Sequence, residues 1–194
     1  MSAVQTTAPC LPSPARCGLR TVLHVGCGGA TIHPLFQVPG WQEIRLDINP
    51  GVQPDIVASI TDMAEVETAS VDAVWSSHNL EHLYPHEVPL ALAEFRRVLR
   101  SGGFALISLP DLQAVAELVA ADKLEDVAYI SPAGPIAPLD MIYGFRPALA
   151  GGNAFMAHRT GFTAKSLSRQ LTEAGFATAA AWRSEFNLWA LAAR

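Results

Sequence analysis

Charge and long apolar runs are both scarce in this sequence, and each scarcity excludes a class of protein. No run of about 18 apolar residues occurs, so a membrane-spanning helix is not expected. Only 16% of the residues are charged, and the 13 lysine and arginine residues form no long run. With a net charge of −5, the chain has no general attraction for nucleic acid or an anionic membrane, and neither is expected as a partner.

Cysteine is also scarce. The three cysteines, Cys10, Cys17 and Cys27, are an odd number without a CxxC pair, which argues against both a disulfide framework and a cysteine zinc knuckle. The N-terminus lacks the basic start and apolar block of a secretory signal. These absences indicate a reducing compartment, and we expect a cytoplasmic protein.

The sequence does contain enough apolar material for one domain. Half of the 194 residues are hydrophobic, which excludes disorder over most of the length and allows one substantial core. Residues 1–18 are rich in proline and small polar residues and are expected to form an N-terminal arm, with the domain spanning 19–194. Proline and glycine interrupt any regular period over 122–160, and such a long irregular insertion predicts a cover over the substrate.

Short apolar runs alternate with helical patterns through the domain. Strands are expected at 21–25, 43–48, 55–59, 71–77 and 104–109, and the clearest helix at 86–100. This alternation predicts an α/β fold built on a parallel sheet. A later helix should begin after Thr163 and stop at Gly175. The tail 176–194 could be helical on its alanine content, but its aromatic residues favour two strands and a turn.

The first expected strand runs into a glycine-rich loop, Gly26-Cys27-Gly28-Gly29-Ala30. Glycines at that junction let the backbone pass close to a ligand at the carboxyl edge of the sheet. A dinucleotide fingerprint would need a third glycine at Thr31, and the prolines that follow prevent a long phosphate-facing helix. The loop therefore disfavours a nicotinamide dinucleotide.

Two aspartates follow the next strands. Asp47 ends the second expected strand, where a carboxylate can accept both hydroxyls of a ribose in nicotinamide and adenosyl cofactors alike. Asp62 lies just past the third, where it could accept the exocyclic amine of an adenine. Two carboxylates without a basic residue for a phosphate fit an adenosine that carries no phosphates.

The stretch SSHNLEH (76–82) contains H-x-x-E-H, a spacing used by zinc peptidases. A zinc site would need His78 and His82 on one face of a stable helix, and a third protein ligand from elsewhere. The stretch instead follows a strand directly, and Pro85 comes soon after it, so we expect a strand-to-helix loop and no metal.

Several motifs together resemble one family, the class I S-adenosylmethionine-dependent methyltransferases, and in particular their small type 11 branch. The resemblance covers about residues 20–194 and rests on LHVGCGGA, RLDIN, ASITDM, VDAVWSSHNLEHL, EFRRVLRSGGFALISLPD, and the late HRxGFT and LxxAGF. It implies an α/β, Rossmann-like, seven-stranded and mostly parallel sheet, with helices on both faces and an antiparallel last strand.

The resemblance also implies a cofactor, S-adenosyl-L-methionine. Gly26 and Gly28 would approach its methionine part, Asp47 its ribose, and Asp62 with Met63 its adenine. The full cofactor-binding set it implies is Gly26, Cys27, Gly28, Asp47, Ile48, Asp62, Met63 and Ser77. The chain departs from the family at His24, where an acidic residue is usual, and at Ala30, where a third loop glycine is usual.

The function we expect is methyl transfer to a small-molecule or sugar-like acceptor, through oxygen or nitrogen. His78, at the end of the fourth strand, is the first candidate for a general base, although it could instead bond only the loop backbone. Tyr143, His158 and Asp111 are reserve candidates. Two alternatives remain open: a non-catalytic module that binds adenosylmethionine, and a nicotinamide-dependent oxidoreductase. The chain could also act as a homodimer.

Overall fold

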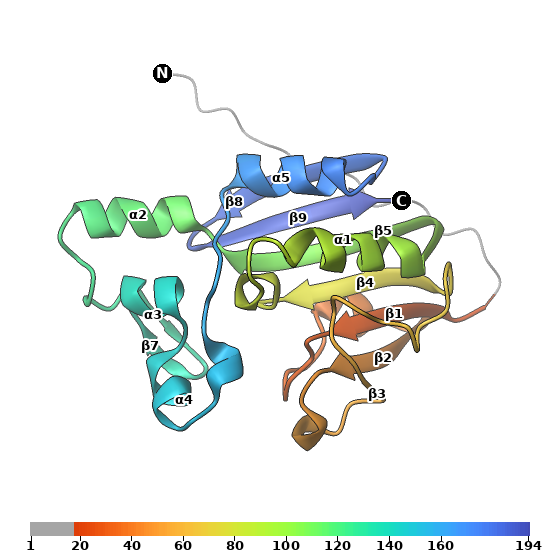
Figure 1. Ribbon diagram of the computed structural model, residues 1–194, viewed down its shortest axis with the longest axis horizontal. Helices are drawn as coiled ribbons and strands as arrows, with labels where there is room; N and C mark the ends of the chain where they lie inside the picture. The colour runs from red at the N-terminus through yellow and green to blue at the C-terminus, as the bar shows by residue number, and fades with distance from the viewer. Residues whose placement is uncertain (1–17) are drawn as a thin grey trace.

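A central seven-stranded sheet organises the computed structural model, which describes residues 18–194 (Figure 1). The order of its strands is β3-β2-β1-β4-β5-β9-β8. Their bounds are β1 (Arg20–Val25), β2 (Trp41–Asp47), β3 (Ile56–Val57), β4 (Val71–Ser77), β5 (Leu99–Pro110), β8 (Thr178–Ser184) and β9 (Asn187–Ala193). The expected N-terminal arm, 1–18, lies outside the described residues except for Gly18.

The strand directions confirm the predicted fold class. Strands β1 to β5 pair in parallel, whereas β9, the last strand, is antiparallel to both β5 and β8. The two-strand interpretation of the tail is therefore correct, because cross-strand pairs such as Trp182 with Trp189 bury apolar side chains that an alanine-rich helix would expose. The third strand is shorter than expected, with two residues.

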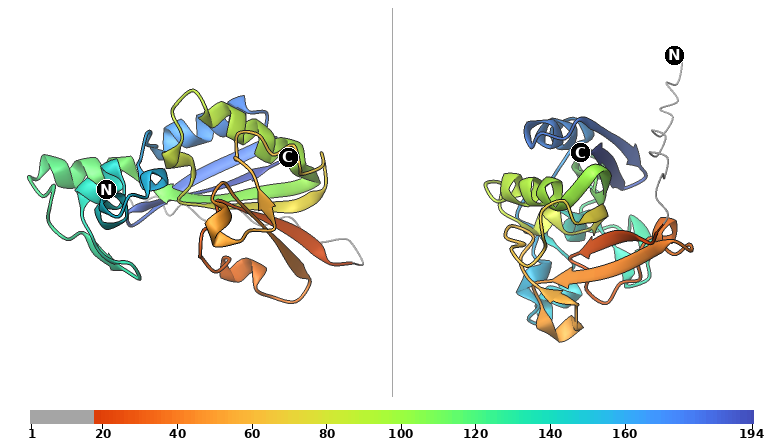
Figure 2. Two further views of the ribbon diagram at one scale, coloured as in Figure 1. Left: turned by 60° about the horizontal axis from the view of Figure 1, so that its bottom comes forward. Right: turned by 90° about the vertical axis from the view of Figure 1, so that its right-hand side faces the viewer.

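One face of the sheet is covered by helices α1 (Val88–Val98) and α5 (Ala164–Glu173), which lie on the same side (Figure 1 and Figure 2). Helix α1 buries a stripe that includes Leu92 and Phe95, both fully inaccessible, against the strand residues of the main core. Helix α5 begins as predicted, since the Thr163 side chain accepts the N–H of Ser166.

The opposite face carries a short 3-10 turn, η1 (Pro34–Phe36), together with aromatic side chains. The prolines of this segment limit the first helix to a single turn, as the sequence indicated. Phe36 packs against Trp41 and Phe104, and Trp75 stacks on Trp189. Side chains, more than helical backbone, therefore cover the sheet on this side.

A second group of elements extends beyond the carboxyl ends of β1 and β4 (Figure 1). It contains α2 (Leu112–Ala120), β6 (Tyr129–Ser131), β7 (Gly134–Ile136), α3 (Pro138–Tyr143), α4 (Arg146–Ala150) and the 3-10 turn η4 (Ala154–Met156). Val115, Ile136 and Met141 form its own small core.

Two further 3-10 turns, η2 (Pro50–Val52) and η3 (Leu80–His82), follow β2 and β4. Within 18–194, no helix is both long and apolar enough to span a bilayer.

Candidate functional site

A cavity of about 430 Å³ opens at the carboxyl edge of the sheet, where β1, β2 and β4 end. Its walls come from the loops after these strands, from the turn after β3, and from the end of the 122–160 insertion. Residues that line it include Gly26, Gly28, Gly29, Asp47, Ile48, Asn49, Ile60, Thr61, His78, Asn79, His82, Phe155, Met156 and Arg159. This is the edge at which doubly wound sheets bind their ligands.

The glycine loop approaches the cavity through two residues with positive φ, Gly26 (58°) and Gly28 (49°). Side chains other than glycine rarely adopt this conformation. Arg45 on β2 holds the loop in place, because its guanidinium donates to the carbonyls of Gly28 at 2.7 Å and Ala30 at 3.1 Å. Hydrogen bonds from Arg45 therefore fix the conformation of the loop, which is not followed by a long helix.

Asp47 links the glycine loop to the loop after β2. Its Oδ2 accepts the N–H of Gly28 and its Oδ1 accepts the N–H of Asn49, each at 2.8 Å. The side chain is largely buried but lines the cavity. Since each carboxylate oxygen can accept a second hydrogen bond, Asp47 retains the capacity to accept two hydroxyl groups.

Both residues that depart from the family pattern have partners within the fold, Ala30 through the bond from Arg45 to its carbonyl and His24 through its side chain. His24, buried in β1, places Nδ1 2.7 Å from Oε1 of Glu43 on β2, so a carboxylate lies beside the position that is usually acidic. Burial lowers the pKa of His24, against the opposing effect of Glu43.

Cys27 is buried outside the cavity lining, and burial raises the pKa of its thiol. It is suited to packing and not to nucleophilic attack.

The residues predicted at the adenine lie less directly on the cavity. Asp62 is exposed and does not line it, while its N–H closes a turn onto the carbonyl of Ser59 at 3.1 Å. Met63 is fully buried in the main core, and its N–H donates to Glu94 at 2.7 Å. The neighbouring Ile60 and Thr61 form the cavity wall instead, and the sequence reasoning did not single them out.

His78 is one of the residues that line the cavity. It follows β4 with a positive φ of 49°, and its N–H donates to the carbonyl of Ser108 at 2.8 Å. Its Nδ1 is 3.3 Å from Oε1 of Glu81. Burial opposes the charged imidazole, but the Glu81 carboxylate outweighs this and raises the pKa of His78. Ser77, the last residue of β4, is half-buried and is not among the lining residues.

Glu81 is a buried carboxylate that the sequence reasoning noted only as part of a motif. It lies in η3 with 1% of its surface exposed, and neither carboxylate oxygen has a hydrogen-bond donor among the described residues. Burial would raise the pKa of Glu81, but the His78 imidazole outweighs this, lowers the pKa and keeps the group ionised.

Asn79 is a further cavity residue that the sequence reasoning missed. Its Nδ2 is buried and has no partner within the described part of the chain. A buried amide without an acceptor is costly, so a ligand that offers an oxygen here would satisfy it. The only available signal was its position directly after His78 at the end of a buried strand.

The reserve candidates fall in different places. Asp111 is fully buried, caps α2 and pairs with Arg183, away from the cavity. Tyr143 is exposed at the end of α3, outside the cavity lining, while its carbonyl accepts the N–H of His158 at 3.1 Å. His158 is half-buried behind the cavity, beside His82 and Glu81. Burial lowers the pKa of His158 and favours the neutral ring.

Part of the chain matches a known family model. Residues 23–107 match the model of a methyltransferase domain. This segment includes the glycine loop, Asp47, Asp62, His78 and Glu81. A search of curated proteins found no match.

Solved structures resemble the described fold over most of its length. A S-adenosylmethionine-dependent methyltransferase from Archaeoglobus fulgidus is 17% identical with a TM-score of 0.61, covering 91% of this chain and 87% of its own. One from Methanosarcina mazei is 16% identical with a TM-score of 0.60, covering 92% and 94%.

A third structure was solved with its ligands. It is a 1,6-didemethyltoxoflavin-N1-methyltransferase from Burkholderia thailandensis, with bound 1,6-didemethyltoxoflavin and S-adenosylhomocysteine, 17% identical with a TM-score of 0.56, covering 90% of this chain and 71% of its own. Residues 23–107 match the methyltransferase domain model, and the described chain as a whole has the fold of the S-adenosylmethionine-dependent methyltransferases.

Proposed function

We propose that the protein binds S-adenosylmethionine in the cavity at the ends of β1, β2 and β4 and transfers its methyl group to a small-molecule acceptor. The observation that carries this proposal is the pairing of a glycine backbone with one oriented carboxylate. Gly26 and Gly28 open the loop to a ligand, and Asp47 presents its carboxylate beside them. No basic side chain among the cavity-lining residues lies on this loop, which suits an adenosine without phosphates.

The donor supplies an electrophilic methyl group: the acceptor's lone pair forms the new bond to carbon while the S–CH₃ pair stays on sulfur, leaving S-adenosylhomocysteine and a proton to be removed. The chain's own residues then have two tasks, to align the acceptor and to exclude water. Phe155 and Met156, from the end of the insertion, supply apolar surface on the acceptor side of the cavity.

His78 is the residue proposed to take the acceptor's proton. It lines the cavity, and Glu81 lies behind its ring at 3.3 Å. A carboxylate in that position orients an imidazole and stabilises the imidazolium that forms when the ring accepts a proton. Tyr143 and His158 do not line the cavity. Their proposed role is therefore to hold in place the residues that contact the acceptor.

Calorimetric titration tests the cofactor. S-adenosylmethionine and S-adenosylhomocysteine should bind with one site per chain. NAD should not bind, because this loop lacks the third glycine and the helix N-terminus that would hold a pyrophosphate. Tighter binding of NAD than of S-adenosylhomocysteine would reject the proposal in favour of an oxidoreductase.

A second candidate function is a module that binds the cofactor without catalysis, which the changes at His24 and Ala30 favour. Incubation with methyl-labelled cofactor and fractionated metabolite extracts separates the two. Label appearing in a low-molecular-weight product supports the enzyme. Cofactor binding without labelled product in any fraction supports the module.

A further inference from the structure

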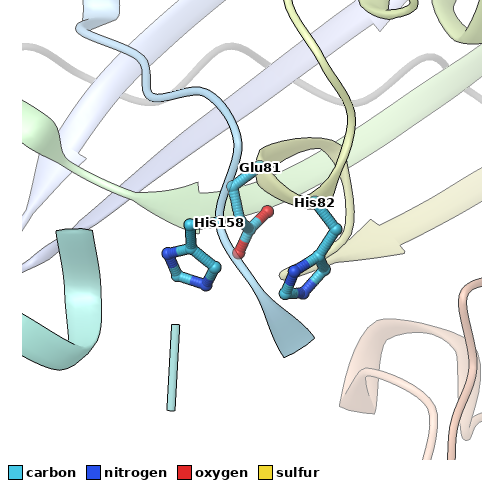
Figure 3. Close-up of side chains that lie close together, drawn as sticks. All are labelled: Glu81, His82 and His158. Atoms are coloured by element: carbon cyan, nitrogen blue, oxygen red, sulfur yellow. The ribbon is translucent and has the colours of Figure 1, made fainter. Parts of the chain in front are cut away.

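Three side chains that could ligate a metal meet beside the cavity: Glu81, His82 and His158. One ligand atom of each lies within 4.8 Å of those of the other two, and Figure 3 shows the Glu81 carboxylate pointing between the two rings. The segments that carry them are joined by backbone, since the N–H groups of Arg159 and Thr160 donate to the carbonyl of Glu81 at 2.8 and 3.2 Å. The cluster is thus built into the contact between η3 and the end of the insertion.

Backbone carbonyls fix how both imidazoles present their lone pairs. Nδ1 of His82 is 3.2 Å from the carbonyl oxygen of Ala157, and Nδ1 of His158 is 2.8 Å from that of Met141. A carbonyl can only accept, so each Nδ1 carries the proton and each neutral ring keeps a free lone pair on Nε2. Metal-binding histidines are oriented in this way, with the second nitrogen bonded to a backbone oxygen.

The carboxylate between them has no adequate partner. Glu81 is 1% exposed, and neither oxygen has a hydrogen-bond donor within residues 18–194. His78 approaches Oε1 at 3.3 Å, outside hydrogen-bond geometry, so the carboxylate lies beside two further imidazoles without a donor from the described residues. A buried carboxylate facing acceptors is unfavourable unless a positive charge joins them.

We propose that Glu81, His82 and His158 bind one divalent transition-metal ion, of the class that includes Zn²⁺, Co²⁺ and Mn²⁺. Two imidazoles and one carboxylate match the preference of these ions, whereas Mg²⁺ and Ca²⁺ prefer oxygen ligands alone. Three protein ligands leave positions open. The sequence predicts no metal, because Pro85 and the strand that ends at Ser77 leave HNLEH without a long helical frame. The fold supplies a third side chain from elsewhere, since it brings His158 beside Glu81 and His82.

The consequence for the reaction rests on the proposed methyl transfer. His82 lines the cavity, so an ion held by these three side chains would be accessible from the cavity. Such an ion would bind a hydroxyl oxygen of the acceptor and lower the pKa of that hydroxyl. Its proton would pass to His78 or to water, and the oxygen lone pair would then form the bond to the methyl carbon as the S–CH₃ pair returns to sulfur. Metal binding beside the cavity would restrict the acceptor to a hydroxyl compound.

Cobalt titration of the chelator-treated protein tests the site without cofactor or acceptor. Visible absorption and calorimetry should report one Co²⁺ per chain in the parent. In Glu81→Gln and His158→Ala the affinity should fall by at least about 10–100-fold, the scale of disturbing a ligand shell. The matched control is His86→Ala, which removes an exposed histidine stacked on Tyr84 and should bind as the parent does.

The outcomes separate this inference from the proposed function. No saturable cobalt binding in the parent, or equal affinity in the parent and both ligand variants, overturns the metal site even if S-adenosylhomocysteine binds normally. Cobalt binding that depends on Glu81 and His158, in a protein that does not bind S-adenosylhomocysteine, upholds the site and rejects the proposed function. Circular dichroism checks folding, and His82→Ala, at a half-buried position, replaces either variant that fails to fold.

Discussion

The side chain of Asn79 occupies the space in which a Cβ atom on Gly26 would lie. A Cβ built on Gly26 would approach Cγ of Asn79 to 2.4 Å, far inside van der Waals contact. The loop after β1 and the loop after β4 therefore touch directly at the cavity, and the touching residue carries a buried amide with no partner in the described chain. Glycine is required at position 26 because of the contact with Asn79 as well as because of the positive φ.

Gly26→Ala should weaken binding of S-adenosylhomocysteine by about tenfold or more. Both the left-handed conformation and the contact with Asn79 oppose the new methyl group, and strain of this kind costs about 1–3 kcal/mol. Gly29→Ala is the matched variant in the same loop, because a Cβ there meets nothing within 4 Å and φ is not positive. Calorimetry should show a clearly smaller loss for Gly29→Ala, and equal losses would contradict the steric argument.

Asp47→Ala should reduce cofactor affinity by about 1.5–3 kcal/mol, the scale of a lost hydrogen bond to a charged group. Part of the loss will come from releasing the N–H groups of Gly28 and Asn49, which Asp47 holds. Asp62→Ala tests the second predicted carboxylate, which lies outside the cavity lining, and on that geometry its loss should be smaller. Unchanged affinity in a folded Asp47→Ala protein would reject the ribose role.

Sequence reasoning predicted the sheet well because its strands are strongly patterned. Strand β4 matches its expected bounds, since 71–77 contains the apolar residues Val71, Ala73, Val74 and Trp75 and is followed by a loop. Strand β5 begins earlier than expected, at Leu99, because Gly103 allows the chain to pass within contact of the carbonyl of Asp72 and continue the pairing with β4. Such a start depends on a neighbouring strand and cannot be read from local propensity.

The site was harder to predict where it depends on distant segments. The loop glycines and Asp47 follow their strands directly, so the parallel topology alone brings them to one edge. The meeting of Glu81 with His158 instead depends on how the 122–160 insertion returns to η3, through the backbone bonds of Arg159 and Thr160. No periodicity in the sequence encodes that contact. The HNLEH motif alone therefore gives no sign that His158 could be a third metal ligand.

His78→Ala should lower turnover by about 10²–10⁴-fold if the imidazole takes the acceptor's proton, with nearly unchanged affinity for S-adenosylhomocysteine. The measurement is single-turnover transfer to the acceptor found by the label screen. A role limited to bonding the loop would give a much smaller change. Turnover within about threefold of the parent, in a variant that binds cofactor, would remove His78 from the catalytic list.

Ligand binding should protect the 122–160 insertion from proteolysis. Asn153, Phe155 and Met156 from this segment line the cavity, so a bound ligand would contact them and restrain the chain around them. Limited proteolysis followed by mass spectrometry should show slower cleavage within 122–160 when S-adenosylhomocysteine is present. The same cleavage rate with and without ligand would contradict a cover that closes on binding.

The insertion should also loosen in acid, because one carboxylate organises its helices. Asp140 is almost fully buried in α3 and accepts hydrogen bonds from the Ala137 N–H at 2.9 Å and from Arg146 Nε at 2.8 Å. Burial alone would raise the pKa of Asp140, but the bonds from Arg146 and the backbone outweigh it and lower the pKa.

The lowered pKa sets the sign of the pH effect. The unfolded chain binds the Asp140 proton more readily, so the stabilisation is complete above the ordinary aspartate pKa of about 3.9 and is lost as the pH falls through the lower folded value. The protection of α3 and α4 amides, taken relative to the intrinsic exchange rate at each pH, should therefore fall below about pH 4 in the parent. Asp140→Asn should show fast exchange there already at pH 7, and Asp122→Asn, an exposed aspartate of the same insertion, should behave as the parent does. Slow exchange at pH 7 in Asp140→Asn would show that Arg146 and the backbone bonds do not hold the two helices together.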